Sequence, residues 1–237
     1  LGIGFAASSA AVINHVLDAS IDIQMSRTHN RPVAQGRLTD FQALTFAFFL
    51  CAASMLMLWF IINSLTAILT FASLIGYAVI YTVFLKRATP QNIVIGGAAG
   101  AAPPVLGWTA VTGEIHSNAL LLFLIIFMWT PPHFWALAIA KLEDYERAGI
   151  PMLPVTHGED FTRQQVLLYT ILLVVVTVVP YLTGMSGLIY LVTALILGGR
   201  FLYWAIRMRR DPDREIPMRV FRFSITYLML LFAALLI

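Results

Sequence analysis

Eight apolar runs constrain the fold of this chain more than any other feature, because each is close to the ~20 residues that cross a bilayer as a helix. Hydrophobic residues make up 59% of the 237 residues and charged residues only 11%. Soluble domains carry about 25% charged residues, so we exclude a soluble globule, a disordered chain and a coiled coil. We expect an all-α, polytopic transmembrane helical bundle. The runs are 1–17, 41–62, 65–85, 92–112, 118–139, 165–184, 186–206 and 220–237.

The connections between the runs alternate between uncharged and strongly charged segments. The charged connections hold all but two of the 15 Lys and Arg residues. The other two, Arg200 and Arg222, lie in outer turns, from which their long side chains reach the same side. By the positive-inside rule this side faces the cytoplasm, or the matrix of a mitochondrion. The charged connections are 18–40, 86–91, 140–164 and 207–219.

No Gly/Ser-rich linker divides the chain, so we expect a single membrane domain over residues 1–237. Leu1 stands inside an apolar run with no initiator Met before it. We therefore expect the first helix of the domain to be absent from this sequence, and nine spans in the full chain. The only cysteine, Cys51, lies in an apolar run and is expected in the core. The net charge of +3 gives no indication of nucleic-acid binding.

Three polar side chains at the end of the first run stand at helical spacing, namely Asn14, Asp18 and Asp22. If the first helix continues past the membrane edge, all three project from one stripe. Two carboxylates four residues apart repel each other and weaken a helix unless they share a cation. Oxygen ligands without His or Cys suit Mg²⁺, which takes one or two carboxylates together with substrate phosphates. The alternative is a solvated helix end.

Arginines follow this acidic cluster within one loop, and carboxylates holding Mg²⁺ beside guanidiniums form a diphosphate site. The full pattern resembles the first aspartate-rich motif of the UbiA superfamily of intramembrane prenyltransferases. It reads Asn14-x3-Asp18-x3-Asp22, then Arg27-Thr28-x2-Arg31-Pro32.

Two longer stretches, 81–108 and 129–137, resemble the branch of that superfamily that prenylates haem. Taken alone, Lys86 and Arg87 would be topology anchors. If they face the first acidic cluster, they would instead neutralise diphosphate oxygens. Asn92 opens the next helix, whose N-terminus favours anions.

Both stretches contain a proline pair within an apolar run. Pro103-Pro104 and Pro131-Pro132 remove backbone donors in mid-span, which lipid tolerates only where protein or a cavity surrounds them. We expect two broken spans beside an internal cavity. Gly96-x3-Gly100 predicts close helix packing. His133 is either satisfied by a neighbouring carbonyl, or lies against a haem edge or ligates the haem iron.

Residues 140–164 resemble a further signature of the same branch. Many superfamily members carry a second Asp-x3-Asp here, whereas this chain has Ala148 four residues after Asp144. Asp144 is therefore a candidate metal ligand, and Lys141 and Arg147 are candidates for direct diphosphate contact. Solvated side chains are expected at Glu159, Asp160 and Arg163.

The resemblance implies Mg²⁺-dependent transfer of a farnesyl group from farnesyl diphosphate to the vinyl group of haem B. The implied metal ligands and catalytic residues are Asn14, Asp18, Asp22 and Asp144. The implied diphosphate contacts are Arg27, Arg31, Lys86, Arg87, Lys141 and Asn92. The implied haem and prenyl pocket contains His133, Trp108, Trp129, Trp135, Tyr81 and Tyr145.

The resemblance also implies a setting for the reaction. The lipid bilayer would be that of a bacterial inner membrane or a mitochondrial inner membrane, with haem A synthase or oxidase assembly factors as partners.

Two alternative functions remain open at this point. One is a UbiA-type prenyltransferase acting on an aromatic quinone precursor. The other is a secondary transporter or haem-binding membrane module, which broken helices and polar residues near the midplane would suit.

Overall fold

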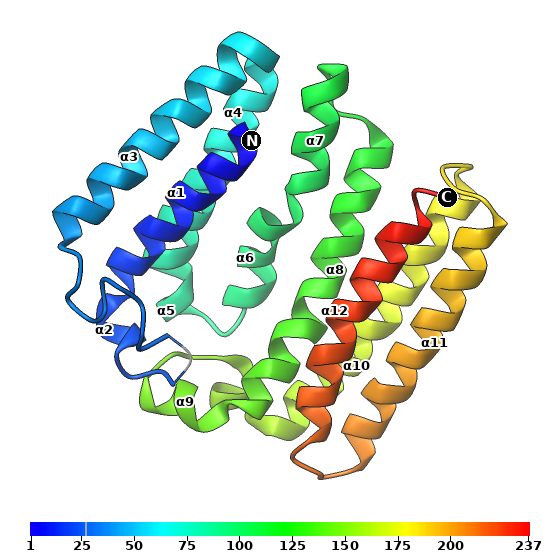
Figure 1. Cartoon of the computed structure of the whole chain (residues 1–237). Helices are drawn as coiled ribbons and strands as arrows, with labels where there is room; N and C mark the ends of the chain where they lie inside the picture. Colours follow the sequence, from blue (N-terminus) through cyan, green and yellow to red (C-terminus); the bar gives the residue numbers. More distant parts are fainter. Residues whose placement is uncertain (27) are drawn as a thin grey trace. The chain divides into compact units, whose positions relative to one another are not determined.

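The computed structural model describes residues 1–26 and 28–237, and for Arg87 the backbone alone. All regular elements of this described part are helices. The chain forms two compact units, one of residues 1–119 with 143–151 and the other of residues 120–142 with 152–237. Figure 1 shows the helices in sequence colours.

In the first unit, α1 packs against α3 and α4, which lie beside it in Figure 1. Two hydroxyl groups join α1 to α3 within the apolar region, because Ser9 donates to the carbonyl of Ala47 at 2.8 Å and Ser54 donates to that of Gly2 at 2.7 Å. The helices of this unit are α1 (Gly2–Leu17), α2 (Ala19–Asp22), α3 (Asp40–Met57), η1 (Leu58–Ile62), α4 (Ser64–Ile75), η2 (Gly76–Leu85), α5 (Lys86–Ala88), α6 (Asn92–Ala101), α7 (Pro103–Thr112) and nearly all of α9 (Leu142–Arg147).

Polar residues at the ends of the apolar runs start the helices. Thr39 and Gln42 form a capping box at α3, in which each side chain accepts a hydrogen bond from the backbone N–H of the other. Asn63 accepts from the N–H of Thr66 at 2.8 Å and so caps α4. α3 and α4 each continue into a π-helix, η1 and η2, without leaving the apolar run.

In the second unit, α11 packs against both α10 and α12. The hydroxyl of Tyr190 donates to the carbonyl of Thr177 at 2.9 Å and thereby joins α11 to α10. Gly158 adopts φ 80°, which bends α10 near its start. The helices are α8 (Ser117–Ala140), most of which belongs to this unit, α10 (Leu153–Leu182), α11 (Leu188–Arg210) and α12 (Ile216–Ala234).

The predicted all-α membrane bundle is confirmed, with one correction to the number of spans. Within the described residues, seven helical segments are long and apolar enough to cross a membrane. The eighth predicted span, 1–17, is a helix of 16 residues, shorter than the ~20 residues that a bilayer requires. The predicted loop 140–164 is also too long, since α9 and the start of α10 lie within it.

The two proline pairs behave differently, so the prediction of two broken spans is half right. Pro103 and Pro104 open α7 directly after α6 ends at Ala101. Pro131 and Pro132 lie inside α8, which continues through them. Prolines are tolerated within membrane helices where nearby groups supply hydrogen bonds to the freed carbonyls.

Arg163 is not the solvated residue that its charged loop predicted. It is 5% exposed, and its Nη1 donates to the carbonyls of Met208 and Asp211 at 2.7 and 3.0 Å. Its Nη2 lies 3.0 Å from Glu159. Arg163 therefore caps the C-terminus of α11, where carbonyls lack partners and a cation is favourable. This contact joins residues 45 positions apart, which no local pattern reveals.

Candidate active site

The backbone turns at the centre of the predicted carboxylate stripe. α1 ends at Leu17, Asp18 adopts φ −98° and ψ 3°, and α2 begins at Ala19. The condition for a single stripe, one continuous helix through Asp22, is therefore not met. Asn14 and Asp18 nevertheless remain one turn apart and in contact, with Nδ2 of Asn14 2.7 Å from Oδ2 of Asp18.

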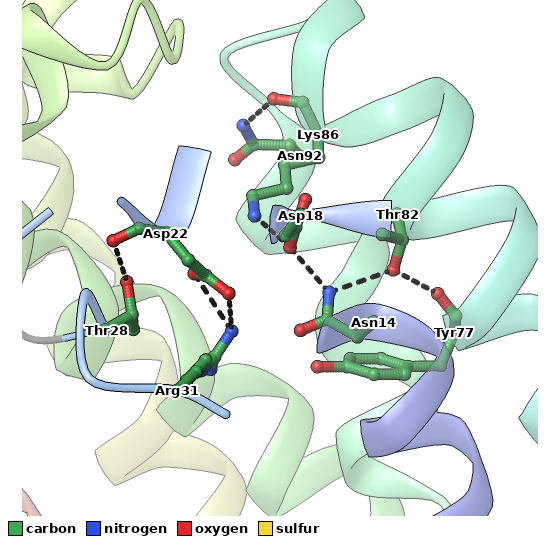
Figure 2. A network of polar contacts seen from close by, with 9 residues as sticks. All are labelled: Asn14, Asp18, Asp22, Thr28, Arg31, Tyr77, Thr82, Lys86 and Asn92. Carbon is green, nitrogen blue, oxygen red and sulfur yellow. Dashed lines mark hydrogen bonds and ion pairs between the residues drawn. The ribbon is translucent and has the colours of Figure 1, made fainter. Parts of the chain in front are cut away.

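Asp18 is held from two sides in the network of Figure 2. Nζ of Lys86 lies 2.5 Å from Oδ2 of Asp18, at the same oxygen that accepts from Asn14. Asn14 also lies 3.4 Å from the hydroxyl of Thr82, which donates to the carbonyl of Tyr77 at 2.9 Å. Asp18 is only 1% exposed, and its other oxygen, Oδ1, is buried without a hydrogen-bond partner. A buried oxygen without a hydrogen-bond partner is energetically costly. A ligand that bound Oδ1 would remove this cost.

Asp22 has a separate partner. Nη1 of Arg31 lies 3.0 and 2.8 Å from the two oxygens of Asp22, which is 3% exposed. The hydroxyl of Thr28 donates to the Asp22 carbonyl at 3.4 Å, and both contacts are drawn in Figure 2. Two of the predicted diphosphate contacts, Arg27 and the side chain of Arg87, lie outside the described residues.

The remaining predicted polar residues occupy other positions. Oδ2 of Asp144 on α9 accepts from the hydroxyl of Ser26 at 2.5 Å, which joins the first and third charged connections, 18–40 and 140–164. Arg147 lies 4.0 Å from the same carboxylate. Asn92 is fully buried, and it donates to the backbone carbonyl of Lys86 at 3.1 Å. Lys141 is exposed and belongs to the second unit.

The donor set fits a magnesium ion that is held jointly with a substrate. Among the described residues, no three His, Cys, Asp or Glu side chains gather closely enough to hold a metal by themselves. The site does offer oxygen donors from Asn14, Asp18 and Asp22, including the unpartnered Oδ1 of Asp18. Mg²⁺ is usually bound by one or two carboxylates with phosphate oxygens and waters completing its shell. These residues therefore suit Mg²⁺ together with diphosphate.

An apolar cavity of about 280 Å³ lies in the same unit, and Pro103 is one of its lining residues. Ala6 and Ala10 line it from α1, and they stand two turns and one turn before Asn14 on the same helix, at intervals of four residues. The other lining residues are Ile3, Ala7, Ala11, Thr70, Ser73, Leu74, Tyr77, Ala99, Gly100, Pro103 and Leu106.

Of the predicted pocket aromatics in the first unit, Tyr81 does not line the cavity itself but contacts Tyr77, which does. Its ring stacks on Tyr77 at 5.6 Å, and a Cβ on Gly96 would lie only 2.2 Å from its Cδ2. Gly96 thus allows close packing of α6 against η2, whereas Gly100, the second glycine of the predicted Gly-x3-Gly packing pattern, has nothing within 4 Å of its Cβ position. Tyr145 is buried on α9. Trp108 stacks on His116 near the end of α7 and does not line the cavity.

In the second unit, His133 and Trp129 form one aromatic group on α8, with ring centroids 4.1 Å apart. Nδ1 of His133 lies 2.7 Å from the hydroxyl of Ser224 on α12, so the partner is a hydroxyl and not the neighbouring carbonyl considered from the sequence. Trp135 is almost fully buried and packs edge-on against Tyr169.

Sequence reasoning missed three residues that hold these groups in place. Ser224 and Thr82 are polar residues inside apolar runs, which is a signal that could have marked them. Ser26, the partner of Asp144, lies in a polar loop and carries no such signal.

The chain belongs to the UbiA prenyltransferase family, which its sequence matches over residues 1–233, and it is a prenyltransferase of the membrane. It is 62% identical to the protoheme IX farnesyltransferase of Methylococcus capsulatus, with 100% of this chain and 80% of that protein covered. It is 60% identical to the protoheme IX farnesyltransferase of Hahella chejuensis, with 100% of this chain and 79% of that protein covered.

Solved structures share the fold. A structure from a study of digeranylgeranylglyceryl phosphate synthase matches 98% of this chain and 80% of that chain, with a TM-score of 0.81 and 21% identity. A UbiA homologue from Archaeoglobus fulgidus, bound to DMAPP and Mg²⁺, matches 98% of this chain and 84% of that chain, with a TM-score of 0.68 and 15% identity.

Proposed function

We propose that this chain transfers a farnesyl group from farnesyl diphosphate to a vinyl group of haem B, giving haem O and diphosphate. One observation carries the proposal: the buried Asp18 keeps one oxygen unpartnered beside Lys86, directly after α1, whose residues also line an apolar cavity. The acceptor is supported by the relatives at 60–62% identity over the whole chain, which are protoheme IX farnesyltransferases.

The diphosphate is placed at the Asp18 and Asp22 networks. Asn14, Asp18 and Asp22 would hold Mg²⁺ there, and the ion would supply charge neutralisation for the leaving diphosphate. Lys86 and Arg31 already lie beside these carboxylates, and each is a cation for the negative charge that develops as the diphosphate leaves. Asn92 acts through Lys86, whose backbone carbonyl it holds. Asp144, Lys141, Arg27 and Arg87 stay proposed members of this site.

The farnesyl chain is placed in the apolar cavity. Small side chains on α1, Ala6 and Ala10, leave room for it, and the face they share with Asn14 leads toward the carboxylates. Tyr77 contributes to both parts, because its side chain lines the cavity and its carbonyl accepts from Thr82 of the Asp18 network. An apolar, water-poor cavity protects a reactive allylic cation from premature capture by water.

The reaction is an electrophilic addition. The C1–O bond of farnesyl diphosphate breaks, and the electron pair leaves with the diphosphate. The vinyl carbon of haem attacks the allylic cation and forms the new C–C bond. Water then adds to the cation on the haem side and loses a proton, which leaves a hydroxyethylfarnesyl group. Aromatic faces stabilise cations, and Tyr81, Tyr145 and Trp135 are the proposed candidates, together with Trp108 and Trp129.

The cellular setting is part of the proposal. We place the active site on the cytoplasmic side of a bacterial inner membrane, or on the matrix side in a mitochondrion, because the basic residues cluster in one set of connections. Both compact units act as one prenyltransferase domain, and haem A synthase or oxidase assembly factors are the proposed protein partners.

The test is a product assay on the purified chain in lipid nanodiscs. Farnesyl diphosphate and Mg²⁺ are supplied with haem B or with an aromatic quinone precursor, and the products are identified by mass. We expect the haem adduct and stoichiometric diphosphate release. A prenylated quinone precursor and unmodified haem would establish the alternative acceptor, whereas no diphosphate release with either acceptor would contradict a transferase.

The metal assignment is tested with two variants and a control. Asp18→Asn and Asp22→Asn remove a ligand charge while keeping the side-chain shape, and we expect each to lower the transfer rate by about 100-fold or more. Glu114→Gln changes an exposed carboxylate outside the site and should keep the wild-type rate. Wild-type turnover in both aspartate variants would overturn the assignment.

A further inference from the structure

A histidine clamped inside the second unit supports an inference beyond the transfer reaction. His133 is 7% exposed, and its ring is stacked between Trp129 and Phe221, with centroid distances of 4.1 and 4.6 Å and interplanar angles of 19° and 27°. The ring of Phe134 meets it edge-on at 4.9 Å. Aromatic contacts on both faces fix the plane of the imidazole.

The hydroxyl of Ser224 determines which imidazole nitrogen carries the proton. This hydroxyl lies 2.6 Å from the carbonyl oxygen of Phe221 and 2.7 Å from Nδ1 of His133. A carbonyl can only accept, so the single hydroxyl proton is donated to Phe221. The hydroxyl must then accept from His133, which places the imidazole proton on Nδ1. Trp129 fixes the same turn by donating its indole N–H to the Ser224 carbonyl at 2.8 Å.

The remaining nitrogen, Nε2, therefore carries a free lone pair. A neutral imidazole with its proton on Nδ1 has its acceptor and metal-ligating atom at Nε2. In the described part of the chain, the hydrogen bond of His133 is made at Nδ1. Nε2 is also not one of the fully enclosed polar atoms that lack a partner, so part of the surface of this atom is accessible.

We propose that Nε2 of His133 is an axial ligand of the iron of the haem substrate, and that Ser224 is the residue that positions it. The inference rests on the proposed function, because haem enters as the acceptor there. Metal-bound histidines generally donate their second N–H to an acceptor that fixes the tautomer and the ring plane, and His133 has this arrangement before any haem is bound. Histidine is also a common ligand of haem iron.

The nature of the acceptor fits a substrate that must leave. A carboxylate that accepts from Nδ1–H raises the basicity of the ligand nitrogen and strengthens metal binding. Ser224 offers a neutral hydroxyl instead. The iron bond at Nε2 is therefore weaker than in a histidine–carboxylate pair, which allows release of the haem product.

The test is a spectroscopic haem titration of the full chain in nanodiscs. Resonance Raman spectra of the ferrous complex report the iron–histidine stretch, and labelling all histidines with ¹⁵N should shift this band in the wild-type protein. We expect His133→Ala and His133→Asn to lose the band and to bind haem more weakly. His157→Ala removes an exposed histidine of the same unit and should keep both the band and the affinity.

The variant Ser224→Ala tests the positioning role separately. It should keep the iron–histidine band but move its frequency, and it should weaken haem binding by roughly tenfold, as outer partners of metal ligands do. An unshifted frequency would remove Ser224 from the proposal. If His133 were a base for the attacking water, His133→Ala would lower turnover and leave the haem spectrum unchanged, and this result would overturn the ligand assignment.

The product assay separates this inference from the proposed function. Haem O formed by a wild-type chain that shows no ¹⁵N-sensitive band would overturn the ligand assignment and leave the transfer reaction standing. A wild-type chain that forms no product with haem, and binds none, would overturn both.

Discussion

Lys86 and Asp18 form a buried ion pair at 2.5 Å, and this pair occupies one oxygen of the carboxylate that is proposed to hold the metal. The side chain of Asp18 is 1% exposed and that of Lys86 is 17% exposed. A cation that approaches Asp18 without diphosphate therefore competes with the ammonium group of Lys86. The second carboxylate repeats this arrangement, since Asp22 is paired with Arg31 at 2.8 Å.

The first prediction concerns this competition. Lys86→Gln should increase the affinity of the site for Mn²⁺, an EPR-visible substitute for Mg²⁺, by about tenfold in the absence of diphosphate, because the competing positive charge is gone. The same variant should lose most farnesyl transfer. Arg219→Gln, which changes an exposed arginine outside the site, serves as the control for Mn²⁺ binding. Equal Mn²⁺ affinity in Lys86→Gln and wild type would show that the pair does not restrain metal binding.

The second prediction concerns the glycine that contacts Tyr81. Gly96→Ala should destabilise the chain by about 1–3 kcal/mol, as overpacking of a close contact does, because the new Cβ would lie 2.2 Å from the Tyr81 ring. Gly100→Ala is the matched control in the same helix, with nothing within 4 Å of its Cβ position. Thermal unfolding in detergent compares the two. Equal melting temperatures would contradict the packing described for Gly96.

The third prediction compares two arginines that make the same local pair. Arg163 pairs with Glu159 and Arg219 pairs with Glu215, both at i,i+4. Arg163→Ala should cost ~3 kcal/mol or more, because it leaves the last carbonyls of α11 buried and unpartnered. Arg219→Ala removes an exposed pair and should cost less than ~0.5 kcal/mol. Similar losses in thermal stability for both variants would refute the capping role of Arg163.

The fourth prediction concerns the proposed site of the farnesyl chain. Ala10→Leu adds three carbons to the cavity wall and should raise the KM for farnesyl diphosphate several-fold, with a smaller effect on the shorter geranyl diphosphate. A misfolded fraction would lower the maximal rate with both substrates by the same factor and would leave both KM values unchanged. The ratio of the two KM values therefore serves as an internal control for folding. An unchanged ratio would place the prenyl chain outside this cavity.

The sequence predicted those parts of the site that depend on neighbours along the chain. The contact between Asn14 and Asp18 follows from helical spacing, and it is present at 2.7 Å. The turn at Asp18 and the pairing of Asp22 with Arg31 were not predictable from spacing, because they depend on contacts with a following loop and with Lys86, 68 residues away. The same limit applies to Ser26 and Asp144, which are 118 residues apart.

The proline pairs illustrate a second limit. A proline removes one backbone donor at every position, but whether the helix ends there depends on what surrounds it. The pair at Pro103 separates two helices, whereas the pair at Pro131 lies within a continuous one. The sequence pattern is the same in both cases, and the difference arises from packing that the pattern does not encode.

The two ion pairs at the acidic turn have a consequence for the order in which substrates can bind. Asp18 with Lys86 and Asp22 with Arg31 give two negative and two positive groups, so these two pairs together carry no net charge before anything enters. A divalent cation alone, or diphosphate alone, would leave a strongly charged site within protein of low dielectric. The charges of the cation and the diphosphate nearly cancel when both are bound. Binding and release of the two together are therefore favoured over binding or release of either one alone.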